Sequence, residues 1–196
     1  MNLLQNQSVP CVSLLEQMRA CEQMPGLSVL DHGIAVGNRY AELIRHIRDG
    51  KPLTSEWRLP EWIYDPLILM RLLPDDLMET YQIWHDCGKP SCLVVDDEGK
   101  RRFPNHAQGS KDIWLSLGGD ERVGDLIGMD MDAHLLRDEG VPDFAKRPQA
   151  VALLLTALAE IHANATMFGG IESTSFKIKA KALAKRGKAV LKRLAE

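Results

Sequence analysis

The chain has 196 residues, of which 45% are apolar and 26% are charged, and its formal net charge is −3. This composition is typical of a globular protein with a sizeable core, and we expect a single domain over 1–196. The core is expected over about 27–167 and a C-terminal helix over about 173–196. The small negative charge argues against general affinity for polyanions, and no run of about 18 apolar residues suggests a membrane span.

The start of the chain and the cysteines indicate a compartment. Met1–Gln5 lacks the basic and long apolar segments of a secretory signal. The four cysteines are too sparse for a disulfide framework and indicate reduced thiols: Cys11, Cys21, Cys87 and Cys92. We therefore expect a cytoplasmic protein without a membrane partner.

Two helices are expected in the first quarter of the chain. Apolar spacing predicts the first over 11–23 and the second from about Val29 to Arg48. His32 falls on the apolar face in the first turn of the second helix. His46 lies about four turns further along, roughly 21 Å away and too far to share a metal ion with His32, so we expect a partly exposed surface histidine.

Residues 49–74 are expected to be irregular, because four prolines interrupt them and no helical period runs through them. Three aromatic residues, Trp57, Trp62 and Tyr64, are interspersed. A loop of this length is either a lid or binding loop, or a surface segment held in place by its tryptophans. The sequence leaves both interpretations open.

A helix from Asp75 carries an apolar face towards the tetrapeptide His85-Asp86-Cys87-Gly88, with Gly88 as the expected helix terminator. Adjacent His and Asp on one helix offer a ring nitrogen and a carboxylate oxygen about 100° apart around the axis. Two such groups can lean towards one divalent cation without saturating it. Ionisable groups on a buried face must be paired, hydrogen-bonded or metal-bound. The dyad therefore predicts a metal site that needs further ligands.

The second half of the chain is expected to be helical after a short β-hairpin over 93–103, with Gly99 at a left-handed position. The expected helices run over about Asn105–Leu117, Glu121–Leu136, Gln149–Met167 and from Ser173 or Thr174 to the end. A loop with Pro142 and Pro148 precedes the third of them. The predicted fold class is all-α with one hairpin.

The expected helix from Glu121 offers further ligands. If this helix is continuous, Asp130 and His134 extend its apolar stripe, whereas Asp132 lies about 160° from Asp130. The spacing therefore favours Asp130 and His134 over Asp132 at a site. A solvated acidic helix end is the alternative.

The helix from Gln149 places Glu160 and His162 on faces about 160° apart, so at most one of them can be a primary ligand. His162 fits a hydrogen-bonded core histidine. Glu160 needs a partner, because it is a carboxylate in a strongly apolar helix.

The C-terminal helix carries a lysine stripe beside its apolar face, and the simplest interpretation is a solvated amphipathic helix: Lys177, Lys181, Lys185, Lys188 and Lys192. Lys177 and Lys179 nevertheless follow a Ser/Thr-rich helix start. Free backbone N–H groups at such a start attract phosphate.

Together these motifs resemble the HD superfamily of metal-dependent phosphohydrolases. The resemblance is closest to the HD domains appended to bacterial tRNA nucleotidyltransferases and to stand-alone phage and bacterial relatives. The matching stretches are Ser28–His32 with Val36, Trp84–Pro90, Gly99, and Phe103–His106 with Gly109. They extend from about Leu27 to His134 and imply an HD-type helical bundle from a bacterium or a phage-infected bacterium.

The resemblance implies that His32, His85 and Asp86 bind metal, and that Lys89 contacts phosphate. It also implies that His106 is a ligand of a second metal or a proton donor. The fourth ligand stays open between three acidic residues, Asp130, Asp132 and Glu160, and the number of metal ions stays open between one and two.

Imidazole and carboxylate ligands suit Mn²⁺, Fe²⁺, Ni²⁺, Co²⁺ or Mg²⁺. Such an ion lowers the pKa of bound water and polarises a phosphoryl oxygen. The expected function is hydrolysis of a nucleotide phosphoester, either a phosphomonoester or a cyclic phosphodiester, or of a nucleotide-end phosphate. The candidates for acid–base and phosphate-binding roles are His106, His134, Glu160, Lys89, Lys177 and Lys179.

Two other functions fit the same motif. One is a nucleotide triphosphohydrolase or alarmone hydrolase, which releases pyrophosphate or a longer polyphosphate. The other is a non-catalytic nucleotide- or RNA-binding module, with the lysine stripe as its RNA surface. The sequence leaves the base and the oligomeric state open.

Overall fold

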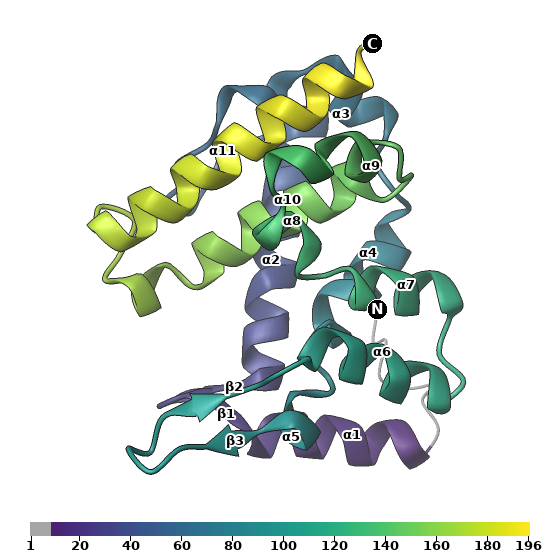
Figure 1. The fold of residues 1–196 in the computed structure, drawn as a ribbon, viewed down its shortest axis with the longest axis vertical. Coiled ribbons are helices and arrows are strands. Elements are labelled where there is room, and N and C mark those ends of the chain that lie inside the picture. The colour runs from purple at the N-terminus through teal and green to yellow at the C-terminus, as the bar shows by residue number, and fades with distance from the viewer. Residues whose placement is uncertain (1–8) are drawn as a thin grey trace. The chain divides into compact units, whose positions relative to one another are not determined.

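The computed structural model describes residues 9–196, and over this range the chain is helical apart from two short antiparallel hairpins (Figure 1). This confirms the expected all-α fold with a short hairpin. The segment Met1–Gln5 lies outside the described residues, and so does the side chain of Cys11. In the part of the chain that is described, no helix has both the length and the apolar character needed to cross a membrane.

The chain divides into two compact units. The first comprises the residues up to Ile34 together with Thr80–Gly128, and the second comprises Ala35–Glu79 together with Met129–Glu196. Two helices, α2 (Val29–Asp49) and α4 (Asp75–Trp84), contribute residues to both units. The expectation of a single domain over 1–196 stays a prediction, because this division does not test whether the units fold independently.

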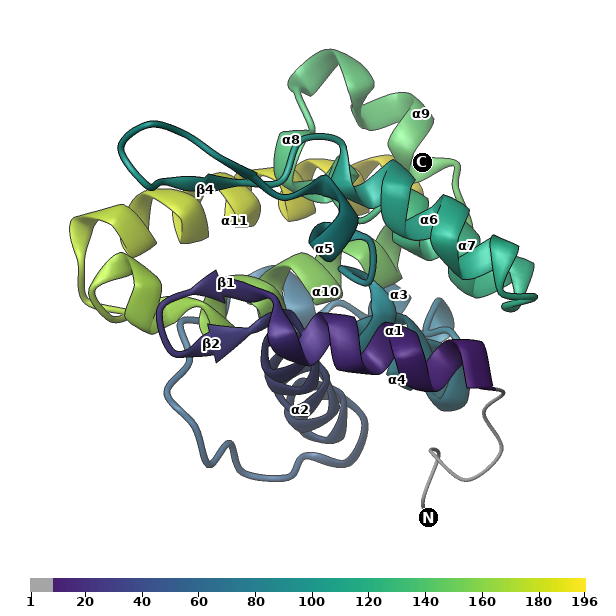
Figure 2. The ribbon, with the colours of Figure 1, turned by 90° about the horizontal axis from the view of Figure 1, so that it is seen from below.

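The first unit contains both hairpins and most of the short helices that position the His-Asp dyad. Figure 2 shows α1 beside the β1–β2 hairpin, and α6 packed along α7. Its elements are α1 (Val9–Ala20), β1 (Glu22–Met24), β2 (Leu27–Ser28), α5 (Lys89–Cys92), β3 (Val94–Val95), β4 (Arg101–Arg102), α6 (His106–Ser116) and α7 (Glu121–Gly128).

The β3–β4 hairpin was predicted from the sequence, whereas the β1–β2 hairpin was not. In the β3–β4 hairpin Val94 pairs with Arg102, and Gly99 has φ +75°, which confirms the left-handed position expected there. The β1–β2 hairpin turns at Gly26, which also has a positive φ. The sequence predicted only a helix over 11–23 in this region, so this second hairpin is an addition to the prediction.

The second unit is built around α10 (Ala150–Ala163), which is apolar on every side and buried along nearly its whole length. A helix of this kind needs neighbours all round it, and α11 lies against it in both ribbon views (Figures 1 and 2). The other elements are η2 (Glu61–Tyr64), α3 (Pro66–Met70), α8 (Asp132–Leu135), η3 (Asp138–Gly140), α9 (Val141–Ala145), η4 (Ala165–Phe168) and α11 (Thr174–Leu194).

The segment over 49–74 is held in place rather than loose, which favours the second interpretation of it. Trp62 is buried, and a Cβ on Gly187 of α11 would lie only 2.2 Å from its ring. The indole N–H of Trp57 donates to the Glu42 carboxylate at 3.1 Å. The segment is also less irregular than expected, since it contains η2 and α3.

Two differences from the predicted helix boundaries affect the candidate site residues. The helix expected to run continuously over Glu121–Leu136 breaks, because α7 ends at Gly128 and α8 begins only at Asp132. Glycine is among the weakest helix formers, and the turn that follows it buries Asp130. The helix α4 ends at Trp84, so the dyad lies in the turn after the helix rather than on it.

Candidate metal centre

The first turn of α2 fixes the position of His32. The Ser28 hydroxyl accepts a hydrogen bond from the Asp31 backbone N–H at 3.0 Å and donates to the Asp31 carboxylate at 2.7 Å. This reciprocal arrangement caps the helix and satisfies a backbone donor that would otherwise lack a partner. The cap holds the turn on which His32 is carried.

Gly33 allows this turn to lie directly against the main chain that precedes the dyad. A Cβ at Gly33 would come within 2.5 Å of the Ile83 carbonyl oxygen and 3.2 Å of the Gln82 carbonyl oxygen. No real side chain tolerates the shorter distance, so glycine is required for this approach. The close contact places His32 beside His85, with the two ring centroids 5.2 Å apart.

The dyad itself is held by hydrogen bonds of the turn after α4. The Gln82 carbonyl lies 2.8 Å from Nδ1 of His85, and the Gly88 N–H donates to the Ser110 hydroxyl at 2.9 Å. Gly88 was expected to terminate the helix, but α4 ends at Trp84 and Gly88 precedes α5 with a φ of −86°. Its role is a close approach instead, because a Cβ there would lie 2.4 Å from the Ser110 backbone nitrogen.

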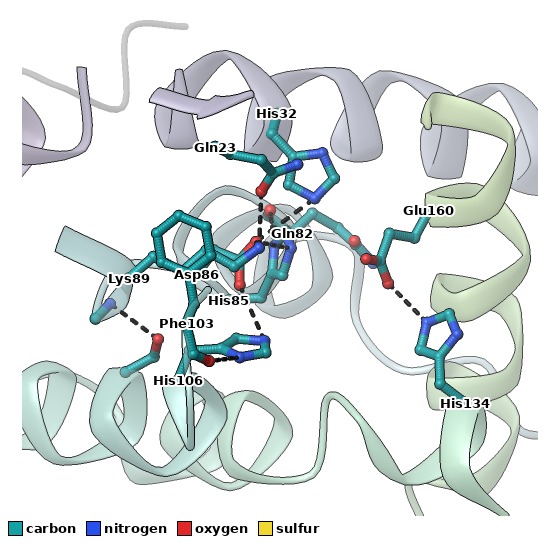
Figure 3. Close-up of polar contacts among 12 residues, drawn as sticks. Gln23, His32, Gln82, His85, Asp86, Lys89, Phe103, His106, His134 and Glu160 are labelled. Atoms are coloured by element: carbon teal, nitrogen blue, oxygen red, sulfur yellow. Dashed lines mark hydrogen bonds and ion pairs between the residues drawn. The ribbon is translucent and has the colours of Figure 1, made fainter. Parts of the chain in front are cut away.

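Three side chains converge in this region of the first unit (Figure 3). The Asp86 Oδ2 atom lies 3.1 Å from Nε2 of His85 and 3.5 Å from Nε2 of His32. Each side chain is only 1% exposed, and their ligand atoms all lie within 4.8 Å of one another. This buried group can hold a metal ion.

The donor chemistry fits a divalent cation. A hydrogen bond from Nδ1 of His85 to the Gln82 carbonyl leaves Nε2 as the ligating atom, which is the usual arrangement for a metal-binding histidine. Burial alone would raise the pKa of Asp86, but the neighbouring His85 and Lys89 hold it well below its usual range, so the group is a carboxylate. Three protein ligands leave coordination positions for water and substrate.

Lys89 and His106 approach the same carboxylate. The Lys89 ammonium lies 2.6 Å from Oδ2 of Asp86, donates to the Gln23 side chain at 2.7 Å and sits over the Phe103 ring. Nε2 of His106 lies 3.5 Å from the other carboxylate oxygen. The first unit therefore brings together five of the residues predicted for the site, namely His32, His85, Asp86, Lys89 and His106.

The other predicted residues belong to the second unit. Asp130 is buried, at 3% exposure. Asp132, by contrast, is the first residue of α8 and forms an ion pair with Arg147. The preference for Asp130 as the inward residue therefore agrees with its burial, although the continuous helix behind that argument is wrong. Which acidic residue completes a metal site stays open.

Glu160 has the partner that its apolar helix requires. Its carboxylate lies 2.7 Å from Nε2 of His134 (Figure 3). Burial alone would lower the pKa of His134, but the Glu160 carboxylate raises it above the ordinary value. The two predicted catalytic residues thus form a hydrogen-bonded pair.

The lysines of α11 have separate surroundings. Lys177 forms an ion pair with Glu172 at 2.8 Å, and Lys185 forms one with Asp138 at the same distance. Lys179 instead lies over the Phe168 ring, 4.9 Å from its centroid. Part of the lysine stripe is therefore neutralised within the second unit, which weakens the case for an RNA surface.

His162 is a core histidine, as the sequence predicts. It is 1% exposed, its Nδ1 lies 2.7 Å from the Leu158 carbonyl, and its Nε2 accepts the Arg58 backbone N–H at 2.9 Å. Burial lowers its pKa to about 4, so the ring is neutral at pH 7. With both nitrogens bonded to the main chain, it has no lone pair left for a metal.

Four residues that shape the centre were not predicted from the sequence. Gly33 carried a recognisable signal in the sequence, because a glycine inside a helical pattern often marks a close backbone approach. Gln23 carried none, since nothing near it in the sequence links it to Lys89. Gln82 and Ser110 act through single hydrogen bonds that only the folded chain reveals.

No protein-family model matches this chain, and no curated protein matches it either.

Proposed function

We propose that the chain is an HD-type metal-dependent hydrolase of nucleotide phosphoesters, acting on a phosphomonoester or a cyclic phosphodiester. The observation that carries the proposal is the buried convergence of His32, His85 and Asp86 on one point. A cation and an imidazole, from Lys89 and His106, approach the same carboxylate. The motif order in the sequence, which resembles that superfamily, supports the same function.

His32, His85 and Asp86 would hold the ion, with Mn²⁺, Fe²⁺, Co²⁺, Ni²⁺ or Mg²⁺ fitting this donor set. When bound, such an ion supplies a nucleophilic water at neutral pH and polarises a phosphoryl oxygen. A metal titration distinguishes one bound ion from two.

The chain's own residues supply positioning and charge. Lys89 is held by Gln23 and by the face of Phe103, so its ammonium is oriented before a substrate arrives. An oriented cation of this kind stabilises negative charge that grows on a phosphoryl oxygen. In this role Lys89 would contact the substrate phosphate.

His106 would move the proton. Its Nδ1 lies 2.9 Å from the Phe103 carbonyl, and its Nε2 faces the Asp86 carboxylate. A ring oriented at both nitrogens, and 18% exposed in its side chain, can protonate a leaving oxygen. We assign it that role in preference to ligation, because it lies outside the group of mutually close ligand atoms.

The test is release of inorganic phosphate, pyrophosphate or triphosphate from a panel of nucleotides, measured with each of several divalent ions. Inorganic phosphate from a monoester, or opening of a cyclic diester, supports the proposal. Release of pyrophosphate or triphosphate indicates a triphosphohydrolase or alarmone hydrolase instead. No turnover with any ion indicates a binding module.

The Asp86→Asn variant ties the activity to this centre. Mutation of residues that only orient the ligands typically lowers metal affinity or activity about 10- to 100-fold. Loss of a ligand is therefore expected to lower the rate of hydrolysis more than about a hundredfold. Asp125→Asn is the matched control, since Asp125 is exposed and pairs with Lys111 in the same unit. Undiminished hydrolysis by a folded Asp86→Asn protein contradicts the proposal.

A further inference from the structure

A separate pocket lies within the second unit, formed by α8, α10, η4 and α11, and none of its lining residues belongs to the metal-binding group. Its volume is about 390 Å³, which falls within the range of small-molecule sites. His134 and Glu160 line it from α8 and α10, and Lys179 and Arg186 line it from α11. Charged side chains from α8, α10 and α11 therefore line the pocket.

The acidic and basic side chains of the pocket differ in whether they are paired. The Glu160 carboxylate lies 2.7 Å from Nε2 of His134. Lys179 and Arg186 are two cations, and neither forms an ion pair with an acidic side chain among the described residues. Two cations without an acidic partner favour a ligand with an anionic group.

Both cations are held in place without being neutralised. The Arg186 guanidinium donates through Nε to the Leu136 carbonyl at 2.9 Å, which orients the group and leaves its charge intact. Lys179 lies over the Phe168 ring, a contact that likewise keeps the ammonium charged. Asn164 adds a buried carboxamide to the lining, and its Oδ1 has no hydrogen-bond partner among the described residues.

The rim of the pocket is apolar and unusually exposed. Leu135 is 66% exposed and Ile178 is 65% exposed, and both line the pocket together with Phe168. Exposed apolar side chains that line a pocket offer a surface that an apolar part of a ligand can cover. The ligand therefore needs an apolar body as well as an anionic group.

We propose that this pocket binds a small organic phosphate monoester, with the phosphate at Lys179 and Arg186 and the apolar body against Leu135, Ile178 and Phe168. A phosphate monoester carries about −1.5 to −2 charges at pH 7, which matches the two cations. The inference goes beyond the proposed hydrolase function, because binding here requires neither metal nor turnover.

The test is isothermal titration of the full chain with 1-naphthyl phosphate in the presence of EDTA, which removes metal and hydrolysis from the measurement. Titrations with inorganic phosphate and with 1-naphthol separate the anion from the apolar body. The expected result is one site per chain that binds 1-naphthyl phosphate more tightly than either fragment. Binding by either fragment as tight as by the whole probe, or no binding at millimolar concentration, overturns the proposal.

Two lysine variants locate the site. Lys179→Ala is expected to weaken binding of 1-naphthyl phosphate about tenfold or more, because a charge-assisted hydrogen bond is lost, and Lys179→Arg is expected to restore most of it. Lys181→Ala is the matched control, since Lys181 is exposed two residues away on α11 and does not line the pocket. Equal weakening by both alanine variants would mean diffuse surface attraction and would overturn the proposal.

The binding test and the hydrolysis test can succeed or fail independently of each other. Binding in EDTA that depends on Lys179 stands even if no nucleotide is hydrolysed with any metal. Hydrolysis that depends on Asp86 stands even if Lys179→Ala leaves 1-naphthyl phosphate binding unchanged.

Discussion

Both units bury ionisable side chains, but different partners satisfy them. In the second unit Glu42 accepts hydrogen bonds from the backbone N–H groups of Thr54 and Ser55 and from the Trp57 indole. His162, in the same unit, is bonded to the main chain at both ring nitrogens. In the first unit the close neighbours of the buried Asp86 carboxylate are other ionisable side chains.

Buried polar groups therefore have two different roles in this chain. A carboxylate or imidazole saturated by backbone donors and acceptors holds a segment of chain in place, as Glu42 and His162 do for the segment over 49–74. A buried set of ligand atoms that face one another concentrates charge at one point. Only the second arrangement gives a cation something to bind.

The largest effect is expected from the glycine that brings α2 against the dyad. Gly33→Ala places a Cβ 2.5 Å from the Ile83 carbonyl, and neither main chain can move cheaply. We expect a loss of about 3 kcal/mol in the free energy of unfolding, at the upper end for overpacking, together with weaker metal binding. Urea denaturation and a metal titration measure the two effects.

Gly140→Ala is the control for this prediction, because a Cβ there meets only the Leu136 side chain at an ordinary 3.4 Å. Its stability should stay within about 0.5 kcal/mol of the parent. An equally stable Gly33→Ala protein with unchanged metal affinity would show that the approach of His32 to the dyad is not constrained as described.

A second prediction concerns pH and His162. Its pKa in the folded chain is about 4, below the ordinary 6.5, so between these values the unfolded chain binds more protons than the folded one. Stability should therefore rise as pH increases from 4 to 6.5, by up to about 3 kcal/mol, and be fully present above 6.5. In His162→Gln this contribution to the rise should disappear, as measured by urea denaturation across that range. Parallel curves for the parent and the variant would refute a buried neutral histidine.

A smaller effect is expected at Glu42. Burial alone would raise its pKa, but the hydrogen bonds from Ser55 and Thr54 lower it to about 2, so they favour the carboxylate. Glu42→Gln turns an amide donor towards the Trp57 N–H and should cost about 2 kcal/mol. The control is Glu56→Gln, an exposed residue of the same segment. Equal stability of the two variants would mean that Glu42 does not anchor the segment.

The grouping of His32 with His85 and Asp86 was implied by the resemblance in motif order and not by helical periodicity, because the dyad lies in the turn after α4. The sequence itself was enough to predict the helical fold class, the β3–β4 hairpin and the place of His32 on a buried helix face. It also predicted that Glu160 would need a partner and that His162 would be a core residue. These inferences depend on burial within one helix, which a periodic pattern encodes directly.

The remainder depends on contacts between distant segments. The helix expected over Glu121–Leu136 breaks after Gly128, where local propensity overrides a continuous apolar stripe. The link between Lys89 and Gln23 joins residues far apart in sequence, and no local pattern encodes such a link. The same holds for Gly33, whose role depends on the main chain of α4.

The most direct test of the metal centre is a titration of the chelator-treated full chain with Mn²⁺, followed by calorimetry and by the metal content after dialysis. The account predicts at least one tightly bound ion per chain and a loss of affinity of more than about a hundredfold in His85→Ala and in Asp86→Asn. His46→Ala should bind as the parent does, because the His46 ring is hydrogen-bonded to the Lys51 carbonyl and the Tyr64 hydroxyl and belongs to no metal-binding group among the described residues. Unchanged Mn²⁺ affinity in His85→Ala and Asp86→Asn proteins that keep their helical circular dichroism would contradict the account.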